Sequence, residues 1–147
     1  MPLILSDYSK ATSALASVLY DLPPRLIGID GGANVGKTTL GRYLAWHFNV
    51  SLIEGDLFLQ DGGSIEHRLW DIDRLIQERL VRERPVVLET ILFLQVLEQI
   101  GRRADFMIYC ENGSESRDDS MDPLLQVYES KYSPRTRAHL VLNLSLP

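Results

Sequence analysis

The stretch from Gly31 to Thr39 constrains this chain more than any other, because it fits the pattern G-x-x-x-x-G-K-[ST]. Glycines at this spacing let the backbone curl so that successive N–H groups point at phosphate oxygens. Lys37 adds a positive charge that can reach the terminal phosphates of a nucleotide, and the Thr38 hydroxyl can ligate Mg²⁺. The pattern therefore predicts a phosphate-binding loop formed by Gly31, Gly32, Ala33, Asn34, Val35, Gly36, Lys37, Thr38 and Thr39.

The residues on either side of the loop decide between a phosphate site and a coincidental glycine turn. Residues 25–30 form a short apolar run after two prolines, which is typical of a buried parallel strand. In residues 38–48 the apolar side chains Leu40, Leu44 and Phe48 recur at helical spacing. A helix that starts at the loop adds free N–H groups and the positive end of its dipole. The order strand, glycine loop, helix favours the phosphate site.

Further apolar runs predict the rest of the fold. Residues 50–54, 85–90, 105–110 and 138–144 have the composition of buried strands, and residues 65–84, 91–100 and 123–132 have that of helices. Strands that alternate with helices predict an α/β protein with a five-stranded parallel sheet and helices on both faces, the three-layer P-loop NTPase fold. At 147 residues, we expect one domain (1–147), with an N-terminal helix and linker in 1–24 and a short lid-like segment in 111–122.

Charge and cysteine content narrow the classes of partner. A net charge of −5 argues against a protein that binds the nucleic-acid backbone. We find neither a run long enough to span a bilayer nor a leader with a basic start, so we expect no membrane partner. Cys110 is the single cysteine, which excludes an intrachain disulfide and favours the reducing cytoplasm. Its place at the end of an apolar run predicts a core residue rather than a nucleophile.

Two acidic residues follow predicted strands. Asp56 comes after residues 50–54, and Glu89 lies at the end of the apolar run in residues 85–90. The carboxyl ends of parallel strands are where α/β folds bind ligands, so both side chains can converge on the phosphate loop. Asp56 can take a proton from a substrate hydroxyl or hold Mg²⁺ through water, or it simply opens a turn with Gly55. Glu89 would be costly to bury alone, which predicts a metal or cation partner.

Other polar residues carry weaker signals. Asp71 and Asp73 lie near the start of a predicted helix, where a solvated face explains them without a site. The three histidines, His47, His67 and His139, lack the spacing of metal ligands, and none is assigned a site.

Several motifs together resemble a known family. They are residues 31–40, Asp56-Leu57-Phe58, Trp70-Asp71-Ile72-Asp73 and Leu88-Glu89-Thr90-Ile91-Leu92, followed by Asp122-Pro123 and the tyrosine-containing segment 127–132. In this order they resemble the uridine kinase-like group of P-loop kinases, and within it they are most similar to nicotinamide riboside kinase. The resemblance covers about residues 27–132.

The resemblance implies a function and a set of site residues. It implies a kinase that uses ATP and Mg²⁺ to phosphorylate a hydroxyl of a nucleoside-like or sugar-like small molecule, with nicotinamide riboside as one candidate. The implied catalytic residues are Lys37, Asp56 and Arg117, the implied metal ligands are Thr38, Asp56 and Glu89, and the implied substrate contacts are Asp56, Phe58, Asp73 and Thr90.

The chain also departs from the family pattern. Thr90 stands where the family has glycine, and Arg117 is the single base of the lid-like segment. The segment between Asp73 and Pro85 is short, and little chain follows the last predicted strand. These departures keep a second hypothesis open, a regulatory or degenerate nucleotide-binding module without efficient transfer.

Overall fold

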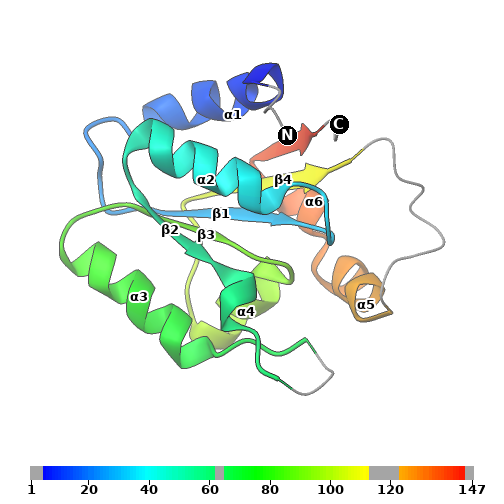
Figure 1. Cartoon of the computed structure of the whole chain (residues 1–147). Coiled ribbons are helices and arrows are strands. Elements are labelled where there is room, and N and C mark those ends of the chain that lie inside the picture. Colours follow the sequence, from blue (N-terminus) through cyan, green and yellow to red (C-terminus); the bar gives the residue numbers. More distant parts are fainter. Residues whose placement is uncertain (1–4, 62–64, 113–122, 145–147) are drawn as a thin grey trace.

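Five parallel strands form the centre of the protein (Figure 1). The computed structural model describes residues 5–61, 65–112 and 123–144. The strands are β1 (Leu26–Gly31), β2 (Ser51–Glu54), β3 (Val86–Glu89), β4 (Phe106–Glu111) and β5 (Leu140–Asn143), and their order in the sheet is β2-β3-β1-β4-β5. All four neighbouring pairs are parallel. The predicted α/β fold with a five-stranded parallel sheet is confirmed.

The central strands are apolar because helices cover both of their faces. Every residue of β1 and of β3 is buried. In the register of the sheet, Glu89 at the tip of β3 lies opposite Ile29 of β1 on one side and Glu54 of β2 on the other. The loop that follows β1 therefore starts beside the carboxylate at the tip of β3.

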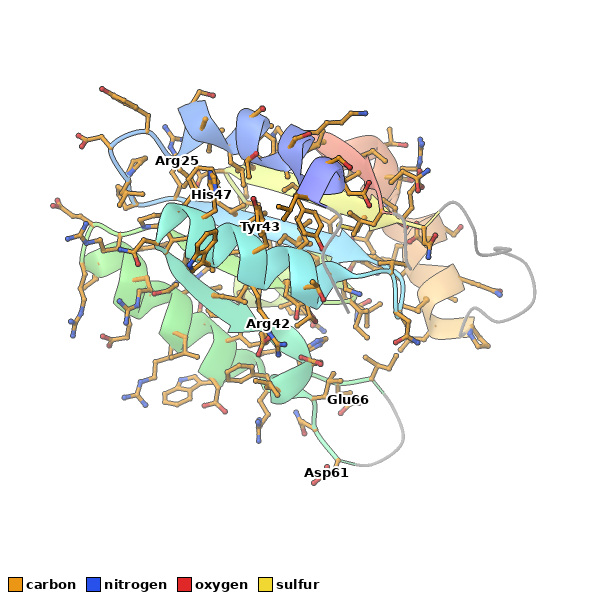
Figure 2. All side chains as sticks on the ribbon, turned by 45° about the horizontal axis from the view of Figure 1, so that its top comes forward. Arg25, Arg42, Tyr43, His47, Asp61 and Glu66 are labelled. Carbon is orange, nitrogen blue, oxygen red and sulfur yellow. The ribbon has the colours of Figure 1, made fainter. Side chains whose placement is uncertain are left out.

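One face of the sheet is covered by α1 (Leu5–Val18) and α2 (Lys37–Phe48) (Figure 1). Leu15 of α1 and Leu40 of α2 are fully buried in the same apolar cluster as Ile29 of β1. The two helices also touch each other, since the ring centroid of Tyr43, which Figure 2 labels on α2, lies 4.9 Å from that of Tyr8 on α1. This packing holds the helix that follows the glycine loop against the sheet.

The opposite face is covered by α3 (Leu69–Val81) and α4 (Phe93–Ile100) (Figure 1). Ile72 and Ile76 of α3 and Phe93 of α4 are fully buried in a second cluster. Phe93 packs directly on the backbone of β1, because a Cβ added to Gly28 would lie 2.0 Å from its ring. A residue with a side chain at position 28 would push α4 away from the sheet.

The remaining elements are one turn and two helices that flank the sheet. The 3-10 turn η1 (Gly55–Phe58) follows β2, and α5 (Pro123–Tyr132) and α6 (Pro134–Arg137) lead into β5. A third apolar cluster, containing Leu92 and Tyr128, joins α5 to the start of α4. Among the described residues, no helix has the length and apolar character needed to cross a membrane.

One predicted helix was too long, and one short helix was not predicted. The helix predicted for residues 65–84 occupies Leu69–Val81 only, because His67 instead forms an antiparallel bridge with Leu59. The backbone N–H of Arg68 donates to the carbonyl of Phe58 at 2.6 Å, so these polar groups pair across a loop rather than along a helix. The short helix α6 was not predicted, although Pro134 at its first turn is compatible with a helix start.

Candidate active site

The glycine loop adopts a backbone that its residue types permit. Gly36 has a φ of 102° and Asn34 a φ of 58°, a region favoured by glycine and tolerated by asparagine. Gly31 has a φ of 150°, and a Cβ there would lie 2.4 Å from the carbonyl oxygen of Cys110 on β4. Val35 is buried in the core and anchors the middle of the loop. The loop is thus shaped by close backbone contact on one side and by an apolar anchor on the other.

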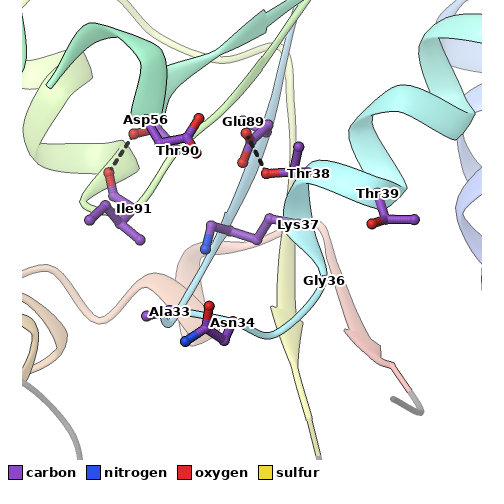
Figure 3. Close-up of a pocket in the computed structure, with 10 residues that line it drawn as sticks. All are labelled: Ala33, Asn34, Gly36, Lys37, Thr38, Thr39, Asp56, Glu89, Thr90 and Ile91. Atoms are coloured by element: carbon purple, nitrogen blue, oxygen red, sulfur yellow. Dashed lines mark hydrogen bonds between the residues drawn. The ribbon is translucent and has the colours of Figure 1, made fainter. Parts of the chain in front are cut away.

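A pocket of about 460 Å³ opens at the carboxyl ends of β1 and β3, within the range of small-ligand sites (Figure 3). It is lined by the loop residues Ala33, Asn34, Gly36, Lys37, Thr38 and Thr39 and, across from them, by Asp56, Glu89, Thr90 and Ile91. The structure therefore brings most of the predicted loop residues and three predicted acceptor or metal residues to one site. Of the remaining loop positions, Gly31 and Val35 shape the loop from behind, and Gly32 contributes a carbonyl group.

Lys37 is the first residue of α2, and its side chain is only 7% exposed. Its Nζ donates a hydrogen bond to the carbonyl of Gly32 at 2.6 Å, within the loop. Burial lowers the pKa of Lys37, while the nearby carboxylates of Glu89 and Asp30 act in the opposite direction. The ammonium group is held at the pocket by a neutral carbonyl acceptor, which a negatively charged phosphate oxygen can replace.

Thr38 and Glu89 form the part of the pocket suited to a metal. The Thr38 hydroxyl donates to Oε1 of Glu89 at 2.9 Å (Figure 3). Burial raises the pKa of Glu89, which is 2% exposed, and the bond from Thr38 and the charge of Lys37 partly offset this effect. Hydroxyl and carboxylate oxygens are the ligands that Mg²⁺ prefers, so this pair fits the ion.

The described residues do not bring three or more His, Cys, Asp or Glu side chains together as a metal cluster. Mg²⁺ usually needs none, because it is held by one or two carboxylates together with substrate phosphates and water.

Asp56 lies in η1 on the far side of the pocket from the loop (Figure 3). Its side chain is exposed, and the turn that carries it rests on Thr90. A Cβ added to Gly55 would lie 2.4 Å from the Cβ of Thr90 and 2.5 Å from its hydroxyl. The Thr90 side chain thus fills the space directly beneath the turn, and only a glycine fits above it.

The Thr90 hydroxyl is fixed by two hydrogen bonds. It donates to the carbonyl of Ile91 at 2.8 Å, and Nε2 of His67 lies 2.7 Å from the same oxygen. Because a hydroxyl has one proton, Nε2 of His67 must be the donor in the second bond. Burial lowers the pKa of His67, which keeps its ring neutral at physiological pH. Thr90 lines the pocket but is 1% exposed, so it offers a substrate little surface.

Three predicted residues are not brought to this pocket by the described structure. Phe58 lines a separate hollow beside β2, where the guanidinium of Arg68 lies 5.8 Å from its ring. Asp73 on α3 accepts a hydrogen bond from Nε of Arg102 at 2.6 Å, in a partly exposed ion pair. Arg117 and the greater part of the lid-like segment lie outside the described residues.

Sequence reasoning missed two residues near the pocket. His67 has no local signal, because its bond to Thr90 joins positions that are 23 residues apart. Asp30 is fully buried at the end of β1, and Tyr128 donates to it from α5. A signal for Asp30 was present, since an acidic residue inside a buried apolar run needs an explanation.

Comparisons with known proteins show which solved structures have a similar fold. No protein-family model matches the sequence, and no curated protein matches it. Among solved structures, a possible uridine kinase from Bacillus stearothermophilus is similar with a TM-score of 0.62 at 15% identity, covering 95% of this chain and 99% of that one.

Two other kinases have a similar fold. A gluconokinase from Sinorhizobium meliloti 1021 has a TM-score of 0.55 at 23% identity, covering 84% of this chain and 85% of that one. A shikimate kinase from Acinetobacter baumannii has a TM-score of 0.50 at 16% identity, with coverage of 90% and 89%. At these identities the likeness establishes the fold alone: this chain has the α/β fold of P-loop kinases.

Proposed function

We propose that this protein is a kinase that uses ATP and Mg²⁺ to phosphorylate a hydroxyl group of a small molecule. The observation that carries the proposal is that Lys37, the Thr38–Glu89 pair and Asp56 line one pocket at the carboxyl edge of the sheet. Three kinases of small molecules among the structural neighbours support this reaction class. The proposal goes beyond the fold, because the same fold can carry other activities.

The loop side of the pocket would hold the nucleotide. Its backbone N–H groups and the start of α2 would bind the phosphates, and the ammonium of Lys37 would move from the Gly32 carbonyl to a phosphate oxygen. Thr38, Glu89 and Asp56 would hold Mg²⁺, which when bound neutralises charge on the transferred phosphoryl group. Transfer of this kind depends on positioning and charge stabilisation and needs no covalent intermediate.

The other side of the pocket would hold the acceptor. Asp56 is exposed to the pocket and would accept the proton of the substrate hydroxyl as general base. We propose a nucleoside-like or sugar-like acceptor, and nicotinamide riboside is the first riboside to test. Arg117, if it reaches the transferred phosphoryl group, would add positive charge there.

The test measures ATP consumption by purified protein with Mg²⁺ against a panel of ribosides, sugars and small polyols. An acceptor should raise the rate above the hydrolysis background, and Asp56→Asn should lower that rate by about 10²- to 10⁴-fold, the usual contribution of a general base. Asp61→Asn is the matched control, because Asp61 is an exposed carboxylate in the following loop, away from the pocket (Figure 2). The kinase assignment fails if no acceptor exceeds background and if Asp56→Asn changes no turnover.

A second function has its own support. Phe58 and Asp73, two of the residues expected to contact an acceptor, lie outside the pocket. This placement favours a regulatory module that binds a nucleotide without efficient transfer. Calorimetry separates the two functions: a module binds ATP–Mg²⁺ with an affinity that no acceptor in the panel changes, and it shows no acceptor-dependent turnover.

A further inference from the structure

Asp30 is a carboxylate without exposure to solvent, one residue before the end of β1 and directly before the phosphate loop. Its side chain lies on the side of the sheet where α5 and the start of α4 pack. Burying an ionised carboxylate is costly unless it is well paired. The buried carboxylate of Asp30 therefore lowers the stability of the fold, and neither the loop motif nor the predicted transfer chemistry uses it.

The pairing of Asp30 is incomplete. Oδ2 accepts a hydrogen bond from the Tyr128 hydroxyl at 2.6 Å, and that hydroxyl in turn accepts one from the backbone N–H of Leu94 at 2.9 Å. Oδ1 has no hydrogen-bond partner of normal geometry in the part of the chain that the structure describes. The N–H groups of Gly31 and Phe93 face the carboxylate and offset its burial only in part. Oδ1 is thus a buried oxygen at which a bound proton would reduce the free-energy cost of burying the carboxyl group.

The charged and titratable groups around Asp30 come from three elements. Tyr128 and Glu129 face it from α5, Lys37 from α2, and Cys110 and Tyr109, the register partner of Asp30, from β4. Burial raises the pKa of Asp30 to about 7, and the bond from Tyr128 acts against this rise. Burial also raises the pKa of Tyr128, and it raises that of Cys110 to about 12, so both stay neutral at pH 7. Asp30 thus has a pKa close to neutrality.

Lys37 connects this carboxylate to the nucleotide. The positive charge of Lys37 interacts with the carboxylate of Asp30, and among the described residues its Nζ donates to the backbone carbonyl of Gly32. A nucleotide would bring several negative charges to the loop and engage that ammonium group. Added negative charge disfavours the ionised form of a nearby carboxylate. The binding of phosphate and the protonation of Asp30 should therefore favour each other.

We propose that Asp30 and Tyr128 are a proton-linked positioning pair for the phosphate loop, in which Asp30 takes up a proton from solvent when a nucleotide binds. The bond to Tyr128 holds the carboxyl group against α5 in both states and orients the strand end from which the loop emerges. This inference rests on the nucleotide site of the proposed function and adds its regulation by pH. Nucleotide affinity then falls as the pH rises above neutrality.

The test is calorimetric titration of the whole chain with ADP and Mg²⁺ at pH 7, in two buffers of different ionisation enthalpy. The dependence of the observed enthalpy on the buffer gives the number of protons taken up. Wild type should take up more than Asp30→Asn, by up to about half a proton, because a group with a pKa near the pH is half ionised. Proton exchange by ADP itself contributes equally in both proteins, so it cancels in the difference between them. Equal proton uptake in both proteins overturns the inference.

Tyr128→Phe provides a second measurement. Losing the bond to the ionised carboxylate raises the pKa of Asp30, so the pH of greatest proton uptake should move upward. Tyr132→Phe is the matched control on the same helix, because its hydroxyl pairs with Glu98 and not with Asp30. If Asp30→Asn fails to fold, an identical pH profile in wild type and Tyr128→Phe refutes the pair. Absence of ADP binding in wild type refutes the nucleotide site itself.

Discussion

The close approach of Gly55 and Thr90 leads to a quantitative prediction about the turn that carries Asp56. In Gly55→Ala the new Cβ would lie 2.4 Å from the Thr90 Cβ, 2.5 Å from its hydroxyl and 2.8 Å from the Glu89 carbonyl. Ordinary contacts begin at 3.4 Å, so the turn or the Thr90 side chain must move by about 1 Å. Overpacking costs about 1–3 kcal/mol, and disturbing the buried bond to His67 adds about 1 kcal/mol or more. We expect a loss of about 2–4 kcal/mol in the free energy of unfolding.

The assay is urea unfolding of the single and double variants, followed at equilibrium. Thr90→Gly alone should destabilise, because it removes a buried methyl group and leaves the His67 donor without its partner. In Gly55→Ala with Thr90→Gly, the side-chain clash is gone, so the combined loss should be smaller than the sum of the two single losses by about 1–3 kcal/mol.

Gly101→Ala is the matched control for this cycle. Gly101 has a φ of 71° and no atom within 4 Å of an added Cβ, so its substitution costs only backbone strain. Its effect should add to that of Thr90→Gly within about 0.5 kcal/mol. The contact argument is refuted if Gly55→Ala lowers the free energy of unfolding by less than about 0.5 kcal/mol. It is also refuted if the losses of Gly55→Ala and Thr90→Gly add within about 0.5 kcal/mol, as those of the Gly101→Ala control should.

Three further outcomes follow from burial. As pH rises from about 4 to 7, Asp30 loses its proton in the unfolded chain but keeps it in the folded protein, where its pKa is near 7, so the free energy of unfolding should fall by up to about 4 kcal/mol; thermal unfolding of Asp30→Asn should show a correspondingly smaller fall. Cys110 is fully buried with its pKa raised to about 12, so a thiol reagent at pH 8 should label it only as fast as the protein unfolds, and prompt labelling of folded protein contradicts this. Phe93→Ala should cost about 3–5 kcal/mol in urea unfolding, whereas Trp46→Ala, at a 76% exposed site, should stay within about 0.5 kcal/mol.

Local patterns in the sequence predicted the fold and the loop side of the pocket. The glycine loop is readable because the backbone conformation and the phosphate chemistry both act within nine residues. The strands are readable because burial on both faces demands unbroken apolar runs, as in β1 and β3. Glu89 and Asp56 were predicted to lie near the loop for a related reason: each comes at the end of a predicted strand, and parallel strands end at one edge of a sheet.

The acceptor side of the pocket could not be predicted in the same way. Asp73 was expected near a substrate from its motif, but packing of α3 beside α4 brings it to Arg102, which is 29 residues away in the chain. Phe58 follows Asp56 by two residues, yet the 3-10 turn directs it to a different hollow. A short motif does not specify which way a side chain points when the turn that carries it depends on its neighbours.

By itself, then, the sequence of this protein predicted a parallel α/β sheet, a phosphate loop after its first strand and two acidic residues, Asp56 and Glu89, near that loop. Only the tertiary structure decided that Thr90 and His67 support the Asp56 turn, and that Asp30 is paired with Tyr128 over 98 residues of chain. The physical reason is the range of the interactions. Periodicity and turn chemistry act within a few residues, whereas the pairing of buried polar groups depends on which helices and loops pack over each strand.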